Sequence, residues 1–372
     1  MMCNERSLIM RRFVSGLFIM VFCIGGAAGL SAGGIDAEEY ADSAMLIGSS
    51  MKGDRSITVT DDSGHEVTIR AYPERIVSLA PSNTELLFAI GVGHRLVGVA
   101  EQSDYPPEAR QIESMGGFTT ISAEKVVAAR PDLVVAAPKN SEEVFNRLRS
   151  LGITVLVINP ETIDEILEMI ILLGRVCGAE DNAEMLNQEL SQRIAAVEER
   201  VATRSHTPSV AHIVWHDPIW VSGDRTFQNE VIRTSGGRNA FSGVDEYKIV
   251  GLEEFVSANP DYILVSSGTG MGKAGYDVIY NYVMTEPRLA RLDAVQNNRV
   301  IIIESDIISR GGPRIVDALE EVAEALHPDL YDPLVREMPQ SEESSPLAVI
   351  PLIALFSLAL FILQRRKLSS PS

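Results

Sequence analysis

The chain has 372 residues, 45% of them hydrophobic and 22% charged, and its 51 acidic and 32 basic residues give a formal net charge of -19. This length suffices for two or more domains of ordinary size, and the acidic balance argues against binding nucleic acid through its phosphates. The three cysteines exclude a disulfide scaffold and a thiolate zinc site, because Cys3 and Cys23 lie near the N-terminus and leave Cys177 alone in the body.

The N-terminal segment has the pattern of a secretory signal. Basic residues in 1–12 precede an uncharged apolar run, and small residues follow before an acidic stretch. We interpret residues 1–32 as a signal peptide or an uncleaved signal anchor, and residues 33–56 as a flexible spacer.

The C-terminal segment predicts a membrane anchor. Residues 346–363 are uncharged and mostly apolar, and at a helical rise of about 1.5 Å per residue they span about 27 Å, close to the hydrocarbon thickness of a bilayer. A polar linker, 338–345, precedes this segment, and basic residues open the tail 364–372. The positive-inside rule then places the tail in the cytoplasm and the body outside, so we expect a single-pass protein of the cell membrane.

The first part of the body alternates strand and helix patterns. Residues 57–69 predict a hairpin around a turn at 61–64. The predicted strands that follow are 75–80, 95–100, 132–138 and 153–159, and the predicted helices are 82–90, 123–131 and 142–152. Strands that alternate with helices imply parallel pairing with right-handed crossovers.

A long helical stretch, 163–204, separates this part from a second one and is broken or weakened around 174–178. The strand pattern then restarts. The second part predicts strands at 209–215, 261–267 and 299–305, and helices at 226–237, 252–260 and 312–328.

The two parts have similar sequence patterns. Glu124 and Glu253 each lie seven residues before a Pro-Asp pair that opens an apolar strand. Together with the restart of the pattern, this match indicates two related lobes. We therefore predict an α/β protein of two Rossmann-like lobes, 57–162 and 205–328, joined by one long helix, 163–204, with a ligand cleft between the lobes.

Several stretches make the prediction more specific, namely RIVSLAPSNTE, SDYPPEA, AARPDLVV, FQNEVIRTSGGRNAF and SDIISRGGPRI. They resemble the substrate-binding proteins of ABC importers that take up vitamin B12, haem and iron–siderophore complexes. The resemblance covers residues 57–327 and implies a helical-backbone receptor with two α/β lobes. It also implies partners, a permease dimer with its ATPase subunits, and no cofactor of the protein's own.

The resemblance places the two permease-docking glutamates of the family on Glu124 and Glu253. A pseudo-symmetric protein that docks on a symmetric dimer needs one matching charge on each lobe. The alternative is that both are ordinary exposed acids in the first turn of a helix, where the helix dipole favours them.

The resemblance also implies residues of the ligand cleft. Phe118 and Tyr247 match aromatic positions of the corrinoid-binding members, and flat apolar walls suit a macrocycle. The alternative is that one or both fill a local core. Gln102 stands where those members have a tyrosine, which weakens the corrinoid assignment. The remaining cleft candidates are Pro81, Tyr105, His216, Trp220, Asp306 and Arg310.

The chemistry of three of these candidates can be stated. Asp306 suits the amides of a corrin, Arg310 suits a ligand carboxylate or phosphate, and His216 suits the axial position of haem iron. A direct metal site is not expected, because none of the six histidines forms a His-x-x-His pair and the sequence has no His-rich loop.

Enzymatic function is not expected, because the sequence has no Walker loop, the glycine-rich stretch 268–273 departs from the spacing of a phosphate-binding loop, and no catalytic residue is assigned. We predict a membrane-anchored, extracytoplasmic solute-binding component of an ABC importer that captures a corrinoid. The alternatives are an iron–siderophore or haem ligand in the same family, or a membrane-tethered ligand sensor.

Overall fold

A computed structural model describes residues 56–267 and 278–331 of the chain. The segments interpreted as signal, linker and membrane anchor, 1–32, 338–345 and 346–363, lie outside these residues. Among the helices of the described part, none is long and apolar enough to cross a membrane.

The N-terminal sheet has four parallel strands in the order β4-β3-β7-β8. Its strands are β3 (Ile76–Ser78), β4 (Leu96–Val99), β7 (Leu133–Ala136) and β8 (Thr154–Val157). All residues of β3 and β7 are buried, as expected where both faces of a parallel sheet are covered. An antiparallel hairpin precedes the sheet and consists of β1 (Ile57–Thr60) and β2 (Glu66–Ile69). The predicted hairpin and the predicted parallel pairing are therefore confirmed.

Short helices connect these strands. They are α2 (Pro81–Ala89), η1 (Gly93–Arg95), η2 (Pro107–Gln111), α3 (Ala123–Ala128) and α4 (Glu142–Ser150). A small antiparallel pair, β5 (Gly116–Gly117) with β6 (Thr120–Ile121), lies between η2 and α3.

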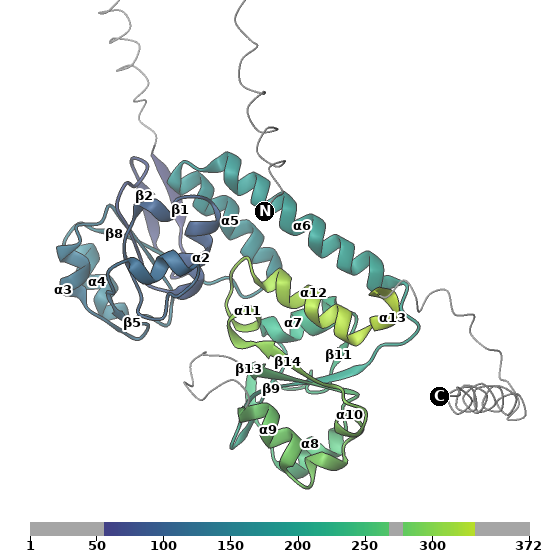
Figure 1. The fold of residues 1–372 in the computed structure, drawn as a ribbon. Coiled ribbons are helices and arrows are strands. Elements are labelled where there is room, and N and C mark those ends of the chain that lie inside the picture. Colours follow the sequence, from purple (N-terminus) through teal and green to yellow (C-terminus); the bar gives the residue numbers. More distant parts are fainter. Residues whose placement is uncertain (1–55, 268–277, 332–372) are drawn as a thin grey trace, which may run out of the picture. The chain divides into compact units, whose positions relative to one another are not determined.

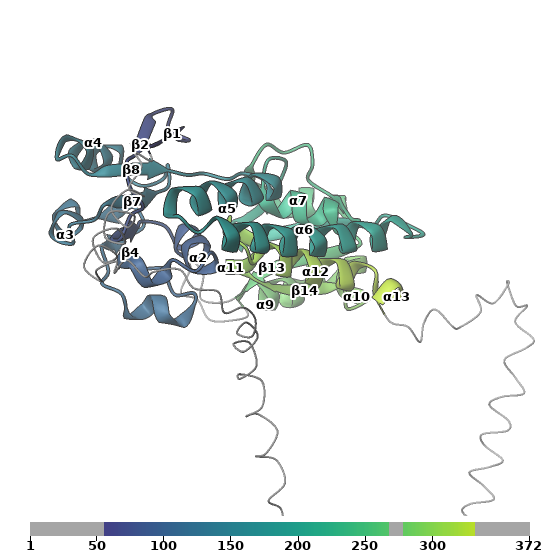
Figure 2. The ribbon, with the colours of Figure 1, turned by 90° about the horizontal axis from the view of Figure 1, so that it is seen from above.

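Two helices occupy the region where one long helix was expected, so that expectation is wrong. Helix α5 (Ile163–Cys177) ends at Gly178, whose φ of 68° is left-handed, and α6 (Glu180–Ala202) follows. The two helices lie side by side in Figures 1 and 2. Gly174 allows this close packing, because a Cβ built there would come within 2.4 Å of the Cβ of Ala183. Glycine at both positions thus turns one helical stretch into a packed pair.

The C-terminal sheet is mixed, with the order β12-β10-β9-β13-β14 and a short β11 beside β9. Its strands are β9 (Ser209–His216), β10 (Ile219–Ser222), β11 (Arg238–Asn239), β12 (Tyr247–Ile249), β13 (Tyr262–Ser267) and β14 (Val300–Glu304). Strands β9, β13 and β14 are parallel, as predicted, whereas β10 runs antiparallel to β9 and β12. No strand was predicted for the stretch that includes Trp220, which forms a hairpin with β9.

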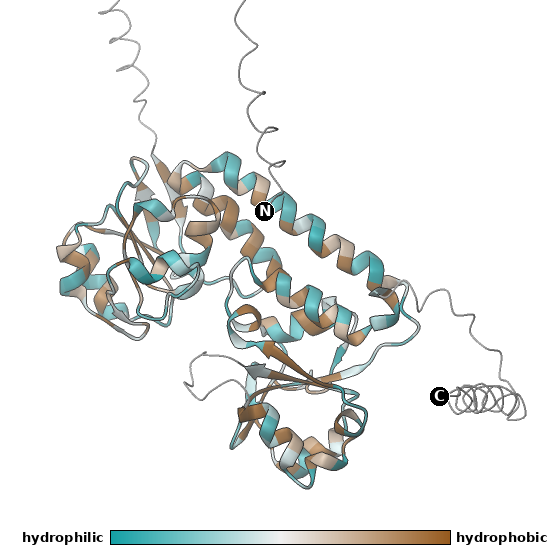
Figure 3. Cartoon of the chain, viewed as in Figure 1, coloured by the Kyte–Doolittle hydropathy of each residue, from teal (hydrophilic) through white to brown (hydrophobic). Residues whose placement is uncertain are grey.

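Helices cover both faces of this sheet. The elements are α7 (Phe227–Thr234), α8 (Leu252–Ala258), α9 (Val278–Thr285), η3 (Leu289–Arg291), α10 (Asp293–Gln296), α11 (Ser305–Ser309), α12 (Ile315–Leu326) and α13 (Pro328–Tyr331). In Figure 1, α7 and α12 lie on one face, and α8, α9 and α10 lie on the other. Figure 3 shows the hydrophobic residues concentrated in the strands between these helices.

One hydrophobic cluster connects the two sheets through the helices between them. It contains Leu133 of the N-terminal sheet, Leu264 of the C-terminal sheet, and residues of α2, α5 and α12. Outside the cluster, Nη2 of Arg193 in α6 donates hydrogen bonds of 2.6 Å to the carboxylates of Asp317 and Glu320 in α12. The helices therefore hold the two sheets in one continuous packing arrangement.

Candidate functional site

The candidate site lies where parallel strands of both sheets end. Helix α2 follows β3, the loop with Asp104 follows β4, and α11 follows β14. In open α/β sheets, ligands bind outside the carboxyl ends of the strands. The local sequence fixes this region firmly. Thr84 of α2 bonds the hydroxyls of Ser78 and Ser103 at 2.8 and 2.9 Å, and Asn83 donates to the backbone oxygen of Ala136 at 3.1 Å.

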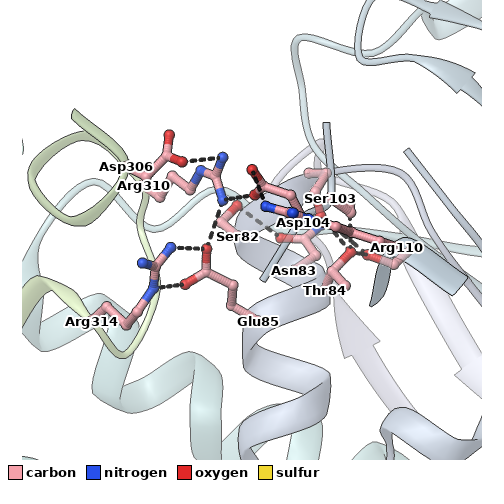
Figure 4. A network of polar contacts seen from close by, with 12 residues as sticks. Ser82, Asn83, Thr84, Glu85, Ser103, Asp104, Arg110, Asp306, Arg310 and Arg314 are labelled. Carbon is pink, nitrogen blue, oxygen red and sulfur yellow. Dashed lines mark hydrogen bonds and ion pairs between the residues drawn. The ribbon is translucent and has the colours of Figure 1, made fainter. Parts of the chain in front are cut away.

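Five charged side chains meet at these strand ends (Figure 4). The carboxylate of Glu85, 2% exposed, accepts hydrogen bonds from Nε and Nη2 of Arg314 at 2.9 and 2.7 Å. Arg310 Nη1 donates to Glu85 and to Asp104 at 2.9 and 3.0 Å, and its Nη2 lies 2.8 Å from Asp306. We call Glu85, Asp104, Asp306, Arg310 and Arg314 the latch cluster.

Burial and charge act in opposite directions on the pKa values in this cluster. Burial raises the pKa of Asp306 above its usual value, and the Arg310 charge only partly offsets that effect. Burial lowers the pKa of Arg310, but Asp306, Glu85 and Asp104 outweigh it, so the pKa is raised. Both arginines therefore stay charged and paired over the physiological range.

The latch cluster contains two of the residues that the sequence placed in a cleft, and a third lies against one of its arginines. Asp306 and Arg310 belong to it, and Pro81 begins the helix that carries Glu85. The Tyr105 ring lies against Arg314, with the guanidinium carbon 3.9 Å from the ring centroid. Arg310, predicted to meet an acidic ligand group, is paired with three carboxylates of the chain itself.

Gln102 and Phe118 are also brought together. The backbone N–H of Phe118 donates to Oε1 of Gln102 at 2.9 Å, and Nδ2 of Asn140 donates to the backbone oxygen of Phe118 at 2.6 Å. Phe118 is half-buried and Gln102 is exposed. The Gln102 side chain thus holds the backbone that carries Phe118.

Aromatic and aliphatic side chains form a strip on the edge of the C-terminal sheet. Trp220 pairs in register with Ile249, and Tyr247 lies two residues before Ile249, so the three share one face. Their exposed fractions are 37%, 48% and 41% in the order Trp220, Ile249, Tyr247. We call these three residues the apolar strip. A row of exposed apolar side chains of this kind is typical of a binding surface.

Hydrogen bonds connect the apolar strip to Ser309, the chain neighbour of Arg310 in the latch cluster. The Tyr247 hydroxyl donates to Gln228 at 3.1 Å, and Gln228 donates to the hydroxyl of Ser309 at 3.1 Å. Ser309 precedes Arg310. Burial raises the pKa of Tyr247, so its hydroxyl stays protonated and able to donate.

His216 lies away from the apolar strip. It pairs in register with Ile219, whereas Trp220 pairs with Trp215, so strand alternation places His216 and Trp220 on opposite faces of the hairpin. The His216 ring lies 4.8 Å from the ring of Trp215 and 5.2 Å from that of Tyr282 on α9, and its Nδ1 is buried without a partner. In residues 56–267 and 278–331, no group of three or more His, Cys, Asp or Glu could hold a metal ion.

Glu124 and Glu253 occupy equivalent, exposed positions. They lie in the first turns of α3 and α8, respectively. The Glu124 carboxylate is 84% exposed and lies 4.0 Å from Arg147, a distance at which a surface pair contributes little. Next to Glu253, Glu254 pairs with Lys248 at 3.2 Å and leaves Glu253 itself facing solvent.

Glu85 and Arg314 were not among the predicted site residues. The sequence does hold a signal for Glu85, since it is the lone charge in the otherwise apolar stretch ELLFAI. A charge on a buried helix face needs a partner. That partner, however, is 229 residues away, so no local pattern identifies it.

Comparison with known proteins places the chain in a family. The model of the periplasmic binding protein family matches residues 76–307. An uncharacterised ABC transporter substrate-binding lipoprotein of Bacillus subtilis, YvrC, is 32% identical over 74% of this chain and 87% of its own length. The vitamin B12-binding protein of Vibrio cholerae is 32% identical over 67% of this chain and 87% of its own length.

Solved structures agree with this assignment. A periplasmic haem-binding protein of Roseiflexus, RhuT, superposes with a TM-score of 0.62 and 27% identity, covering 69% of this chain and 99% of its own. The vitamin B12-binding protein BtuF of Vibrio cholerae gives 0.61 and 30% identity over 70% of this chain and 99% of its own. The chain therefore belongs to the periplasmic binding protein family, whose members are extracytoplasmic binding proteins of transport systems and not enzymes. The family and the non-enzymatic class predicted from the sequence are confirmed.

Proposed function

We propose that the chain is the membrane-anchored solute-binding component of an ABC importer, and that it captures a corrinoid and delivers it to the permease. The observation that carries the proposal is the apolar strip, Trp220, Tyr247 and Ile249, exposed beside strand ends where ligands bind. Flat apolar surface of this kind suits a macrocycle. The likeness to vitamin B12-binding proteins supports the same ligand.

Phe118 is the proposed wall on the side of the N-terminal sheet. Its backbone is fixed by Gln102 and Asn140, so the half-buried ring is presented in a defined position. We propose that it faces the macrocycle together with Tyr247. The ligand then lies between lobes at 57–162 and 205–328, with the helices of 163–204 between them.

Haem is the second candidate ligand, because a haem-binding protein is among the similar solved structures. His216 is the residue that would reach the iron, but it lies on the face of the hairpin opposite to the apolar strip. The observed geometry therefore favours a ligand held by apolar contact over one held by His216.

Docking on the permease is assigned to Glu124 and Glu253. Each stands in the first turn of a short helix beside a different sheet, and both face solvent. Two exposed carboxylates in equivalent positions match the two subunits of a symmetric permease dimer.

The anchor is assigned to residues 346–363, with the tail 364–372 in the cytoplasm, by hydropathy and by the basic residues that follow. Residues 1–32 are assigned to the export signal. The lipoprotein among the relatives supports a membrane-attached form of this family.

A retention experiment tests the proposed ligand. The full chain, purified in detergent micelles, is mixed with equal amounts of cyanocobalamin, haemin and a neutral ferric hydroxamate and then passed over a gel-filtration column. We expect the corrinoid absorbance spectrum to co-elute with the protein at equimolar ratio. Co-elution of haemin or the hydroxamate in place of the corrinoid would overturn the corrinoid assignment and leave the family assignment unchanged.

A further inference from the structure

The latch cluster joins the two sheets at the ends of their strands. Glu85 and Asp104 follow strands of the N-terminal sheet, and the other three members follow β14 of the C-terminal sheet. Their hydrogen bonds span 206 to 229 positions of sequence. The five side chains are at most 30% exposed, and Glu85 is nearly fully buried. Charge-assisted pairs of this length and burial are stronger than surface pairs.

We propose that the latch cluster fixes the spacing of the two sheets and makes the site select ligands that carry no acidic group on the side facing it. This inference rests on the proposed function and names the chemical class of its ligand, a macrocycle with neutral amide edges. It differs from the expectation for Arg310, because here the arginines bind the protein's own carboxylates.

The charge count supports this selectivity. Two guanidinium groups meet three carboxylates, and the next cation, Arg110, lies 3.7 Å from Asp104 and is 68% exposed. Among the described residues, the cluster therefore contains no cation left without a carboxylate. Without the largely exposed Arg110, the five side chains of the cluster carry one negative charge in excess, which repels an acidic ligand group.

Displacement of the internal pairs is unfavourable. A ligand carboxylate that displaced Glu85 from Arg314 would leave the Glu85 carboxylate charged and buried, without the two hydrogen bonds that Arg314 donates to it. Removal of one partner from a buried pair is strongly destabilising. Tyr105 covers the Arg314 guanidinium from one side and limits a ligand's access to it further. A ligand with amide groups leaves the pairs intact.

Hydrogen exchange on the full chain in detergent micelles tests the latch without any ligand. In the Glu85→Gln variant, we expect roughly 10-fold faster exchange in peptides from 98–111 and 304–316, with unchanged exchange in 142–157. Asp104→Asn, at a more exposed member, should give a smaller effect in the same peptides. Glu108→Gln, an exposed acid of the same region, is the matched control and should change nothing. Unchanged exchange rates in both latch variants, or an equal rise in exchange rate throughout the chain, would overturn the proposal that the latch cluster fixes the spacing of the two sheets.

A matched ligand pair tests the selectivity. Cyanocobalamin and its monocarboxylic acid derivatives, each with one peripheral amide hydrolysed, differ by a single charge. We expect at least one acid to bind roughly 5-fold more weakly to the wild-type chain, and this gap to narrow in Asp104→Asn. Equal or tighter binding of every acid would overturn the selectivity. If cyanocobalamin itself fails to bind, the corrinoid proposal fails, and the exchange result alone decides the latch.

Discussion

Arg314 donates two hydrogen bonds, of 2.7 and 2.9 Å, to the carboxylate of Glu85, although 229 positions of sequence separate the two residues. The carboxylate lies on the first helix after the N-terminal sheet begins, and the arginine lies just before α12, after the last strand of the C-terminal sheet. This pair therefore connects the beginning and the end of the folded body at the place where the proposed ligand lies.

The apolar strip should supply much of the ligand affinity. Trp220→Ala or Tyr247→Ala should each weaken cyanocobalamin binding by about 2 kcal/mol, or about 30-fold, because a buried aromatic wall is lost. Titration calorimetry measures the change. The matched control is Ile302→Ala, an apolar residue that is also exposed, at 43%, on the edge strand β14. Unchanged affinity in both aromatic variants would remove the strip from the site.

Charge reversal of the docking acids should separate binding from transport. In cells with the cognate permease, Glu124→Arg combined with Glu253→Arg should abolish corrinoid uptake while the affinity of the purified protein is unchanged. Glu142→Arg combined with Glu254→Arg, at neighbouring exposed acids in helix first turns, is the control and should keep uptake. Normal uptake by the first double variant would contradict the docking assignment.

The buried His212 should make stability depend on pH. Burial lowers its pKa from 6.5 to about 3, and its ring nitrogens lie 3.1 and 2.9 Å from the hydroxyls of Ser222 and Ser266. The unfolded chain takes up a proton below pH 6.5 and the folded chain does not, so stability is full above pH 6.5. It should fall by about 1.4 kcal/mol per pH unit as the pH decreases from 6.5 towards 3.

Urea unfolding at pH 7.5 and pH 5 measures this contribution. His212→Gln should be less stable than the wild type at pH 7.5 but should lose less stability on acidification. The exposed His94→Gln is the control and should retain the wild-type pH dependence. If wild type and His212→Gln lose the same free energy of unfolding between pH 7.5 and pH 5, His212 is not the source of the pH dependence.

Removal of the predicted anchor should release the protein. A stop codon after residue 339 should move the chain from the membrane fraction to the soluble extracytoplasmic fraction with its ligand affinity retained. Cell fractionation with immunoblotting measures the distribution. A truncated chain that stays in the membrane would instead assign the anchor to residues 1–32.

The sequence predicted the elements that depend on local pattern. The run at 132–138 predicted β7, because a buried parallel strand is continuously apolar. The sequence analysis missed the strands β10 and β12. All three residues of β12, Tyr247–Ile249, are exposed, so no alternation of apolar and polar residues marks this edge strand. The sequence located the break around 174–178 but did not predict that α6 packs against α5, because the left-handed conformation at Gly178 and the close approach at Gly174 depend on that packing.

The candidate site was predicted only in part, for a related reason. Asp306, Arg310 and Tyr105 were expected near a ligand, and they do gather at the strand ends. Their partner Glu85 was not expected there, because pairs that join two sheets leave no mark in the local sequence. The opposed faces of His216 and Trp220 follow from the hairpin register, which the absence of a predicted β10 concealed.

The most direct test of the central claim is a calorimetric titration of the full chain in detergent micelles with cyanocobalamin. The account predicts one-to-one binding with a dissociation constant below about 1 μM, or roughly 8 kcal/mol of binding free energy or more. An absence of binding heat up to millimolar ligand, with haemin or a ferric hydroxamate giving a saturating one-to-one isotherm, would contradict the corrinoid assignment.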